Sequence, residues 1–141
     1  GEYIEEEMGH QEWILNDITA LGGSAEEVRY GLPSIATELM VSYAWDTIQR
    51  VNPIGFFGMV LVLEGTSVQL ATQAAEAIQK STGLPNEAFS YLTSHGSLDI
   101  EHVSFFEKLM NKIDNPQDQE AVIHCARIMY KLYGDIFRGI K

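Results

Sequence analysis

The sequence predicts an all-α protein, built as a bundle of four or five main helices. Apolar residues recur at spacings of three and four along almost the whole chain, which is the period of an amphipathic helix. No segment shows the apolar–polar alternation of a half-buried strand bounded by turn residues. With 141 residues, 45% of them hydrophobic and 21% charged, the chain has globular composition and enough length for a core of its own. We therefore expect one helical domain over residues 1–141.

Glycine and proline mark the ends of the first three expected helices. The first covers residues 2–21 and ends at a pair of glycines, which favour a helix C-terminus. A short helix over residues 24–31 starts with the capping pattern Ser-Ala-Glu-Glu. The next helix covers residues 33–51, because a proline suits its first turn and an Asn-Pro pair breaks it at its end.

The second half of the chain is expected to hold four further helices. The longest covers residues 53–81 and belongs in the middle of the bundle, because its first half is apolar all round. A turn with glycine and proline separates it from a short helix over residues 86–94, and a helix over residues 95–113 follows. An Asp-Asn-Pro break precedes the last helix, over residues 117–137.

Charge and cysteine content restrict the class of partner. The net charge of −11, with only 9 Lys and Arg residues, argues against nucleic acid or an anionic membrane as the main partner. The apolar run over residues 54–63 is about half the length that spans a bilayer, and the acidic N-terminus has no apolar signal segment. The single cysteine, Cys125, excludes an intramolecular disulfide and a thiolate-rich zinc site. We expect a cytoplasmic protein.

The stretch HGSLDIEH, residues 95–102, carries the first metal-binding pattern. His95, Asp99 and His102 stand at i, i+4 and i+7, so on a helix they lie within roughly 60° of one another. Imidazole and carboxylate ligands without sulfur suit iron, manganese or zinc. A solvated polar face explains the same pattern equally well, so the prediction depends on matching ligands elsewhere.

The N-terminal segment supplies such ligands in Glu7 and His10. Their i, i+3 spacing puts both side chains on one helix face, and Glu-x-x-His is the pair used in helical di-iron carboxylate bundles. Ile14, Asp17 and Leu21 continue the same stripe, so His10 is expected to point toward the core. Asp17 is a candidate acceptor that orients His10. The alternative is an acidic surface run with an incidental histidine.

A third carboxylate, Glu64, follows a long apolar run without charge. It is costly to bury unless it is paired or bound to a metal. Gly65 and Ser67 beside it have little side-chain bulk and leave room for a ligand. The alternative is a glutamate that reaches the helix surface or caps a neighbouring backbone.

Together these segments offer an inventory that suits two divalent irons with open positions for dioxygen. The candidate ligands are Glu7, His10, Glu64, His95, Asp99 and His102. The fourth histidine, His124, falls on the helix face opposite Val122, Ala126 and Met129, and is expected at the surface.

The segments EEEMGH, LEGTS and HGSLDIEH, and the separations between them, resemble the haem-oxygenase-like di-iron oxidases and oxygenases, also called iron-containing redox enzymes. The resemblance covers nearly the whole chain. It implies a helical fold shared with haem oxygenase, thiaminase II and pyrroloquinoline-quinone synthase. It also implies a site with two ferrous ions and no haem, which activates dioxygen to oxidise a small organic molecule such as a fatty acid or an amino acid.

The resemblance further implies how the ligands divide between the two irons. The implied ligands of one iron are Glu7, His10 and His95, and those of the other are Asp99 and His102, with Glu64 bridging or completing the pair. Some relatives place the first glutamate seven residues before the histidine, where this chain has Tyr3, so Glu6 is kept as an alternative to Glu7. Centres of this kind lose iron readily, so partial occupancy is expected.

Relatives generally carry one or two more helices before the one that bears Glu7, and this chain lacks them. We therefore expect either an N-terminal truncation or a homodimer in which another subunit covers the open side of the bundle. The walls of the substrate cavity are expected near Glu64 and His102, at Phe56, Phe57, Met59, Val60, Phe105 and Phe106. Packing in the core is the alternative for each of these residues.

Three other functions are weighed against the di-iron enzyme. A haem-binding oxygenase is disfavoured, because the axial histidine expected near the chain start is missing and little basic charge is present to hold propionates. A metal-free hydrolase like thiaminase II, with Cys125 as nucleophile, is disfavoured because only His124 accompanies that cysteine. A non-catalytic helical binding protein with a vestigial site differs from the enzyme only in metal content.

Overall fold

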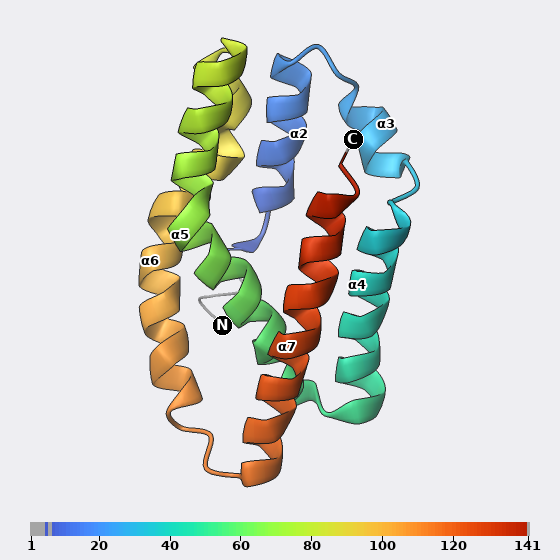
Figure 1. Cartoon of the computed structure of the whole chain (residues 1–141), viewed down its shortest axis with the longest axis vertical. Helices are drawn as coiled ribbons and strands as arrows, with labels where there is room; N and C mark the ends of the chain where they lie inside the picture. The colour runs from blue at the N-terminus through green and yellow to red at the C-terminus, as the bar shows by residue number, and fades with distance from the viewer. Residues whose placement is uncertain (1–4, 6, 141) are drawn as a thin grey trace. The chain divides into compact units, whose positions relative to one another are not determined.

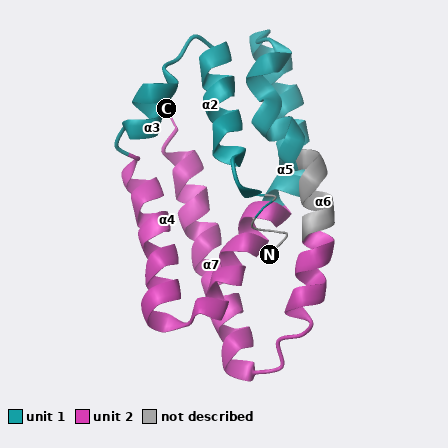
Figure 2. Ribbon diagram, turned by 180° about the vertical axis from the view of Figure 1, so that it is seen from behind, with its two compact units in different colours: residues 1–32, 66–102 teal, residues 33–65, 103–141 magenta. Residues whose placement is uncertain are grey.

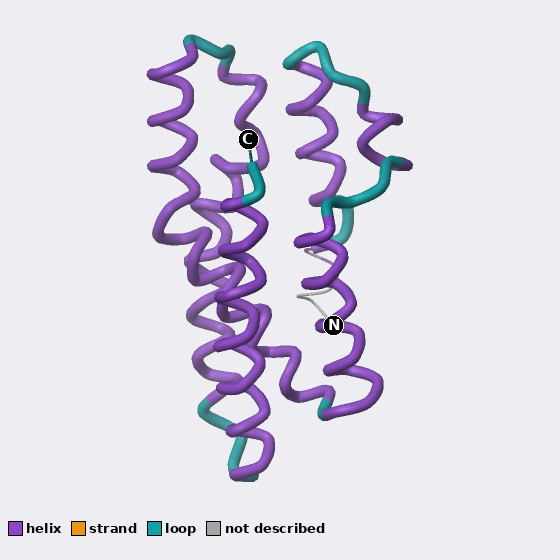
Figure 3. Tube along the Cα trace, turned by 45° about the vertical axis from the view of Figure 1, so that its right-hand side comes forward, coloured by secondary structure: helices purple, strands orange, loops and turns teal. Residues whose placement is uncertain are grey.

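The computed structural model describes residues 5 and 7–140, and for residues 96–102 it describes the backbone but not the side chains. Within these limits the chain is helical from end to end, with short turns and no strand (Figure 3). The predicted all-α fold class is confirmed.

Two compact units make up the chain, and each joins segments that are far apart in the sequence (Figure 2). Unit 1 consists of residues 1–32 and 66–102, and unit 2 consists of residues 33–65 and 103–141. Helices α5 (Phe57–Thr82) and α6 (Ser90–Met110) each contribute residues to both units.

Unit 1 is organised around α2 (His10–Ala20). This helix packs against α3 (Ala25–Tyr30) and against the 3-10 turn η3 (Asn86–Phe89), which leads directly into α6. The α3 helix begins where the capping pattern predicts, because the Ser24 hydroxyl accepts the N–H of Glu27. The small core of the unit contains Ala75, Ala88 and Phe89, with Leu84 and Leu92 packed around them.

Unit 2 contains α4 (Ile35–Asp46), the π-helical turn η1 (Thr47–Val51), the 3-10 turn η2 (Pro53–Phe56) and α7 (Pro116–Arg138). The α4 and α7 helices pack side by side (Figure 1). Asn115 caps α7 by accepting the N–H of Gln117, and a proline follows in the first turn. The core of the unit consists of Ala44, Val62, Cys125, Ala126 and Met129.

The backbones of α5 and α7 come unusually close at Gly58. A Cβ atom there would lie 2.5 Å from the carbonyl oxygen of Val122 and 2.6 Å from the amide nitrogen of Ala126. Any side chain would therefore push the two helices apart, so the core of unit 2 requires glycine at this position.

Several helix boundaries differ from the sequence prediction. Gly9 has a φ of +96°, which interrupts the expected first helix, so α2 begins at His10. The α4 helix starts at Ile35, two residues later than Pro33 suggests, because the Ser34 hydroxyl caps it by accepting the N–H of Thr37. The expected break before His95 is absent, and one helix runs through this residue.

The helical segment Pro53–Thr82 is longer than the uninterrupted apolar run considered above. It has 30 residues and a mean hydropathy of 1.6 in its most apolar window, which satisfies the length and composition of a membrane span. Of that window, 28% is buried within the structure. The core helix of a globular protein passes the same test, so the result is weak support for membrane insertion.

Candidate metal centre

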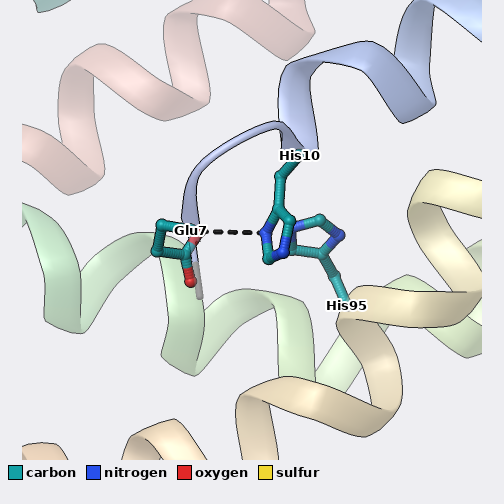
Figure 4. A group of neighbouring side chains, drawn as sticks. All are labelled: Glu7, His10 and His95. Atoms are coloured by element: carbon teal, nitrogen blue, oxygen red, sulfur yellow. Dashed lines mark ion pairs between the residues drawn. The ribbon is translucent and has the colours of Figure 1, made fainter. Parts of the chain in front are cut away.

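Three predicted ligands of unit 1 converge in the structure: Glu7, His10 and His95. One ligand atom from each lies within 4.8 Å of the other two. Glu7 precedes the turn at Gly9, His10 is the first residue of α2, and His95 stands on α6 (Figure 4). The cluster thus joins two segments that are far apart in the sequence and belong to the same compact unit.

Glu7 and His10 approach each other across a turn and not along one helix face. The left-handed backbone of Gly9, which only glycine adopts readily, redirects the chain between them. Nδ1 of His10 then lies 3.0 Å from Oε2 of Glu7. The predicted pairing occurs, but its local cause differs from the uninterrupted helix that the i, i+3 spacing suggested.

Nδ1 of His10 is buried and makes no hydrogen bond with any described residue. The Glu7 Oε2 atom is close to this nitrogen, but the two atoms do not have the geometry of a hydrogen bond. Two ligands bound at about 2.1 Å and a right angle on one ion are separated by about 3.0 Å. The Glu7–His10 geometry therefore matches two adjacent ligands of a single metal ion.

His95 is held in one tautomer by the backbone of its own helix. Its Nδ1 lies 2.9 Å from the carbonyl oxygen of Tyr91. A carbonyl only accepts, so Nδ1 carries the proton and Nε2 keeps the lone pair that a metal requires. Figure 4 shows the ring with one nitrogen directed toward His10 and the other directed away from it.

Two aromatic side chains flank the histidines. Trp13, one turn after His10, stacks on its ring with centroids 4.2 Å apart and lies edge-on to His95 at 5.6 Å. Tyr91, one turn before His95, lies against that ring at 4.1 Å. The two imidazoles are themselves edge to face at 5.0 Å. These contacts restrict the rotation of both rings.

The residues brought together fit a ferrous ion. Two histidines and one carboxylate are the ligand set of non-haem iron oxygenases, in which they occupy one face of the metal and leave other positions open. The buried Nδ1 of His10 and the fixed tautomer of His95 supply the two nitrogens in usable form.

Asp17 has a role different from the one that its position in the stripe suggested. Its side chain is 3% exposed. One carboxylate oxygen accepts the N–H of Ser90 at 3.0 Å together with the Ser90 hydroxyl, and the other accepts the N–H of Tyr91 at 2.9 Å. Asp17 therefore caps the start of α6 across the unit, and among the described residues it makes no hydrogen bond to His10.

The other predicted ligands are placed as follows. Glu64 is 9% exposed, as its apolar surroundings suggested, and it belongs to unit 2. Asp99 and His102 stand on α6, but their side chains lie outside the described residues, as does the whole of Glu6. Their service as ligands stays a prediction. His124 is exposed, which confirms the expectation.

The predicted cavity residues are divided between core and surface of unit 2. Phe56 and Met59 pack against the core formed by Val62, Cys125 and Met129. Phe57 and the buried Phe106 meet edge to face with ring centroids 6.2 Å apart. Val60 is partly buried, and Phe105 is largely exposed. Phe56 and Met59 thus pack in the core, which was the alternative interpretation of these positions.

Cys125 has the surroundings of a structural residue. It is 1% exposed, and burial raises the pKa of its thiol, which disfavours the thiolate that a nucleophile needs. Tyr43 of α4 and Thr47 of η1 contact it, and burial also raises the pKa of Tyr43.

Sequence reasoning missed Trp13, Ser90 and Tyr91. Two of them stand at helical spacing from a predicted ligand, Trp13 three residues after His10 and Tyr91 four residues before His95. That spacing was a usable signal, because residues three and four apart are neighbours on a helix. Ser90 offered no such signal, since its role depends on a contact with a helix that is 73 residues away in the sequence.

Comparison with known proteins agrees with this donor set. Residues 1–134 match a protein family described as iron-containing redox enzymes. No curated protein and no solved structure matches the chain.

Proposed function

The chain belongs to the family of iron-containing redox enzymes, which has the haem-oxygenase-like helical fold, and from this premise we propose that it is a non-haem di-iron oxidase or oxygenase. It acts, in this proposal, on a small organic molecule such as a fatty acid or an amino acid. Membership of the family supplies the iron-dependent redox role, and the number of ions and the class of substrate are proposed here.

One observation carries the proposal: the convergence of Glu7, His10 and His95, with ligand atoms no more than 4.8 Å apart. When bound, ferrous iron supplies the electrons that activate dioxygen. The protein supplies the rest. Glu7 would offset the charge of the ion, and His10 and His95 would hold it through ring nitrogens. Three protein ligands would leave other metal positions open for dioxygen or substrate. Trp13 and Tyr91 lie against the histidine rings and restrict their rotation.

The second iron is proposed from the sequence pattern. Asp99 and His102 follow His95 on α6 at i+4 and i+7, and Glu64 is a buried carboxylate in an apolar helix. A centre with one iron is the second candidate. It is favoured by the fact that the grouped side chains form a complete set for one ion, with two histidines and one carboxylate.

Anaerobic titration with Fe²⁺, followed by a pulse of dioxygen and optical detection, tests the proposal. We expect two ions per chain and a transient absorption that depends on oxygen. His95→Ala and Glu64→Ala should reduce iron uptake, whereas His124→Ala, which removes an exposed histidine, should leave it unchanged.

The number of iron ions bound per chain distinguishes the two-iron centre from the one-iron centre. One tight ion per chain, lost in His95→Ala and kept in Glu64→Ala, would support the one-iron site. Failure of the intact protein to take up iron, or uptake that is the same in every variant, would contradict both and leave a metal-free enzyme or a binding protein.

A further inference from the structure

We propose that Asp17 is a positioning residue for the metal site, which fixes both where His95 meets His10 and which nitrogen of His95 is available. This inference rests on the proposed iron site and adds to it a residue that is not itself a ligand. It is carried by a chain of three contacts within unit 1.

The first step is the cap on α6. Asp17 is nine-tenths or more buried, and its two carboxylate oxygens accept the backbone N–H groups of Ser90 and Tyr91 at 3.0 and 2.9 Å. The hydroxyl of Ser90 donates to the same carboxylate. A carboxylate is favoured at this point, because the first N–H groups of a helix lack intrahelical partners and carry partial positive charge.

The second step is the geometry of the two helices. Asp17 lies beside Ser90, and seven residues earlier on the same helix His10 lies beside His95, so α2 and the first turns of α6 are antiparallel. Seven residues of helix rise about 10 Å. The cap therefore fixes α6 against α2 about two turns from the histidines, and it sets the register in which their rings meet.

The third step passes through Tyr91. Its N–H donates to Asp17, while its carbonyl accepts the Nδ1 proton of His95 at 2.9 Å. One peptide segment thus connects the buried carboxylate to the imidazole. Partners that orient a ligand in this way fix its tautomer and contribute to metal affinity.

Asp17→Asn is the variant that tests the carboxylate cap most directly. The amide keeps one oxygen but replaces the other with NH₂, so it no longer accepts from both Ser90 and Tyr91. Ser90→Ala removes only the hydroxyl contact and keeps both backbone bonds. Leu15→Ala, a buried position on the same helix, destabilises unit 1 without touching the cap and serves as the matched control.

Two readouts test the inference. Nitrogen-15 NMR of the histidine rings, recorded without metal, reports the tautomer of His95. We expect the Nδ1–H form in the unsubstituted protein, Ser90→Ala and Leu15→Ala, and a mixture in Asp17→Asn. In anaerobic competition with a chelator, Asp17→Asn should bind Fe²⁺ about ten- to a hundredfold more weakly than the unsubstituted protein.

An Nε2–H tautomer in the unsubstituted protein would overturn the inference, whether or not Asp17→Asn folds. So would Asp17→Asn with unaltered tautomer and affinity, or a loss of affinity that Leu15→Ala matches. If the unsubstituted protein binds no iron, the proposed function fails, and the tautomer measurements alone then decide the role of Asp17.

Discussion

At the scale of single residues, the candidate site depends on how each ring nitrogen is directed. His95 is constrained by a carbonyl of its own helix, and His10 is constrained by the stacked ring of Trp13. Neither the Tyr91 carbonyl nor the Trp13 ring is a proposed metal ligand, yet both restrict the direction of a ring nitrogen that would bind the ion. The indole of Trp13 stacks on the His10 ring with centroids 4.2 Å apart, so it would report on a metal bound to that ring.

Trp13 should therefore sense metal binding. The chain has two tryptophans, so the Trp45→Phe variant isolates the emission of Trp13. Titration of that variant with Co²⁺, a paramagnetic substitute for Fe²⁺, should quench its fluorescence with the same midpoint as metal binding. Addition of His95→Ala should move the midpoint to higher concentration. Emission that stays constant at saturating Co²⁺ would contradict the placement of the ion beside His10.

At the scale of elements, two glycines allow backbone arrangements that a residue with a side chain would disfavour. Gly9 adopts a left-handed backbone that turns Glu7 back toward His10, and Gly58 allows α5 and α7 to touch. Each position has a matched control in the same unit or helix, so their effects on stability and on the site are separable.

Gly9→Ala should weaken the metal site more than its effect on stability explains. Gly22 also has a positive φ, of +81°, and a Cβ at either glycine would meet nothing within 4 Å. Both substitutions should lower the free energy of unfolding by about 1 kcal/mol, the cost of a left-handed alanine. Only Gly9→Ala should reduce Fe²⁺ affinity in a chelator competition. Equal affinities in the two variants would show that the turn does not set the Glu7–His10 geometry.

Gly58→Ala and Gly65→Ala should change stability in opposite directions, although both lie in α5. A Cβ at Gly58 would collide with the backbone of α7, so we expect a loss of about 1–3 kcal/mol. A Cβ at Gly65 would meet nothing within 4 Å, so its substitution should gain about 0.5–1 kcal/mol from helix propensity. Urea unfolding measures both. A Gly58→Ala protein as stable as the unsubstituted one would contradict the close approach.

At the scale of the whole molecule, the chain has two compact units with separate small cores, one around Phe89 and one around Met129. The cluster of Glu7, His10 and His95 belongs to the first unit. A ligand that binds the folded state stabilises it by mass action. Iron should therefore stabilise the elements that hold this cluster.

Hydrogen exchange should show this stabilisation directly. At a free Fe²⁺ concentration of about one hundred times the dissociation constant, the free energy of unfolding should rise by about 2.7 kcal/mol. Amides of α2 and of the first turns of α6 should exchange more slowly, and His95→Ala should remove the effect. Slower exchange confined to α4 and α7 would place the ion elsewhere.

Helix periodicity, capping residues and Asn-Pro or Gly-Gly breaks predicted the fold class and most element boundaries, because these signals act over a few residues. The same local logic proposed Glu7, His10 and His95 as ligands, and the structure brings them together. It failed at Gly9, since nothing in the periodicity shows which glycine becomes left-handed. It also gave Asp17 the wrong partner, because the start of α6 comes from a distant part of the chain.

By itself, the sequence determined that this protein is helical, that it lacks the thiolates for a sulfur-based metal site, and which imidazoles and carboxylates are available. Only the tertiary structure decided which of them meet, and that the rings of His10 and His95 are oriented by Trp13, Tyr91 and, in our proposal, Asp17. The physical reason is the separation along the chain over which each effect acts. Backbone propensity is local and can be read from neighbours, whereas the contacts of Asp17 with Ser90 and Tyr91 depend on packing between segments separated by more than seventy residues.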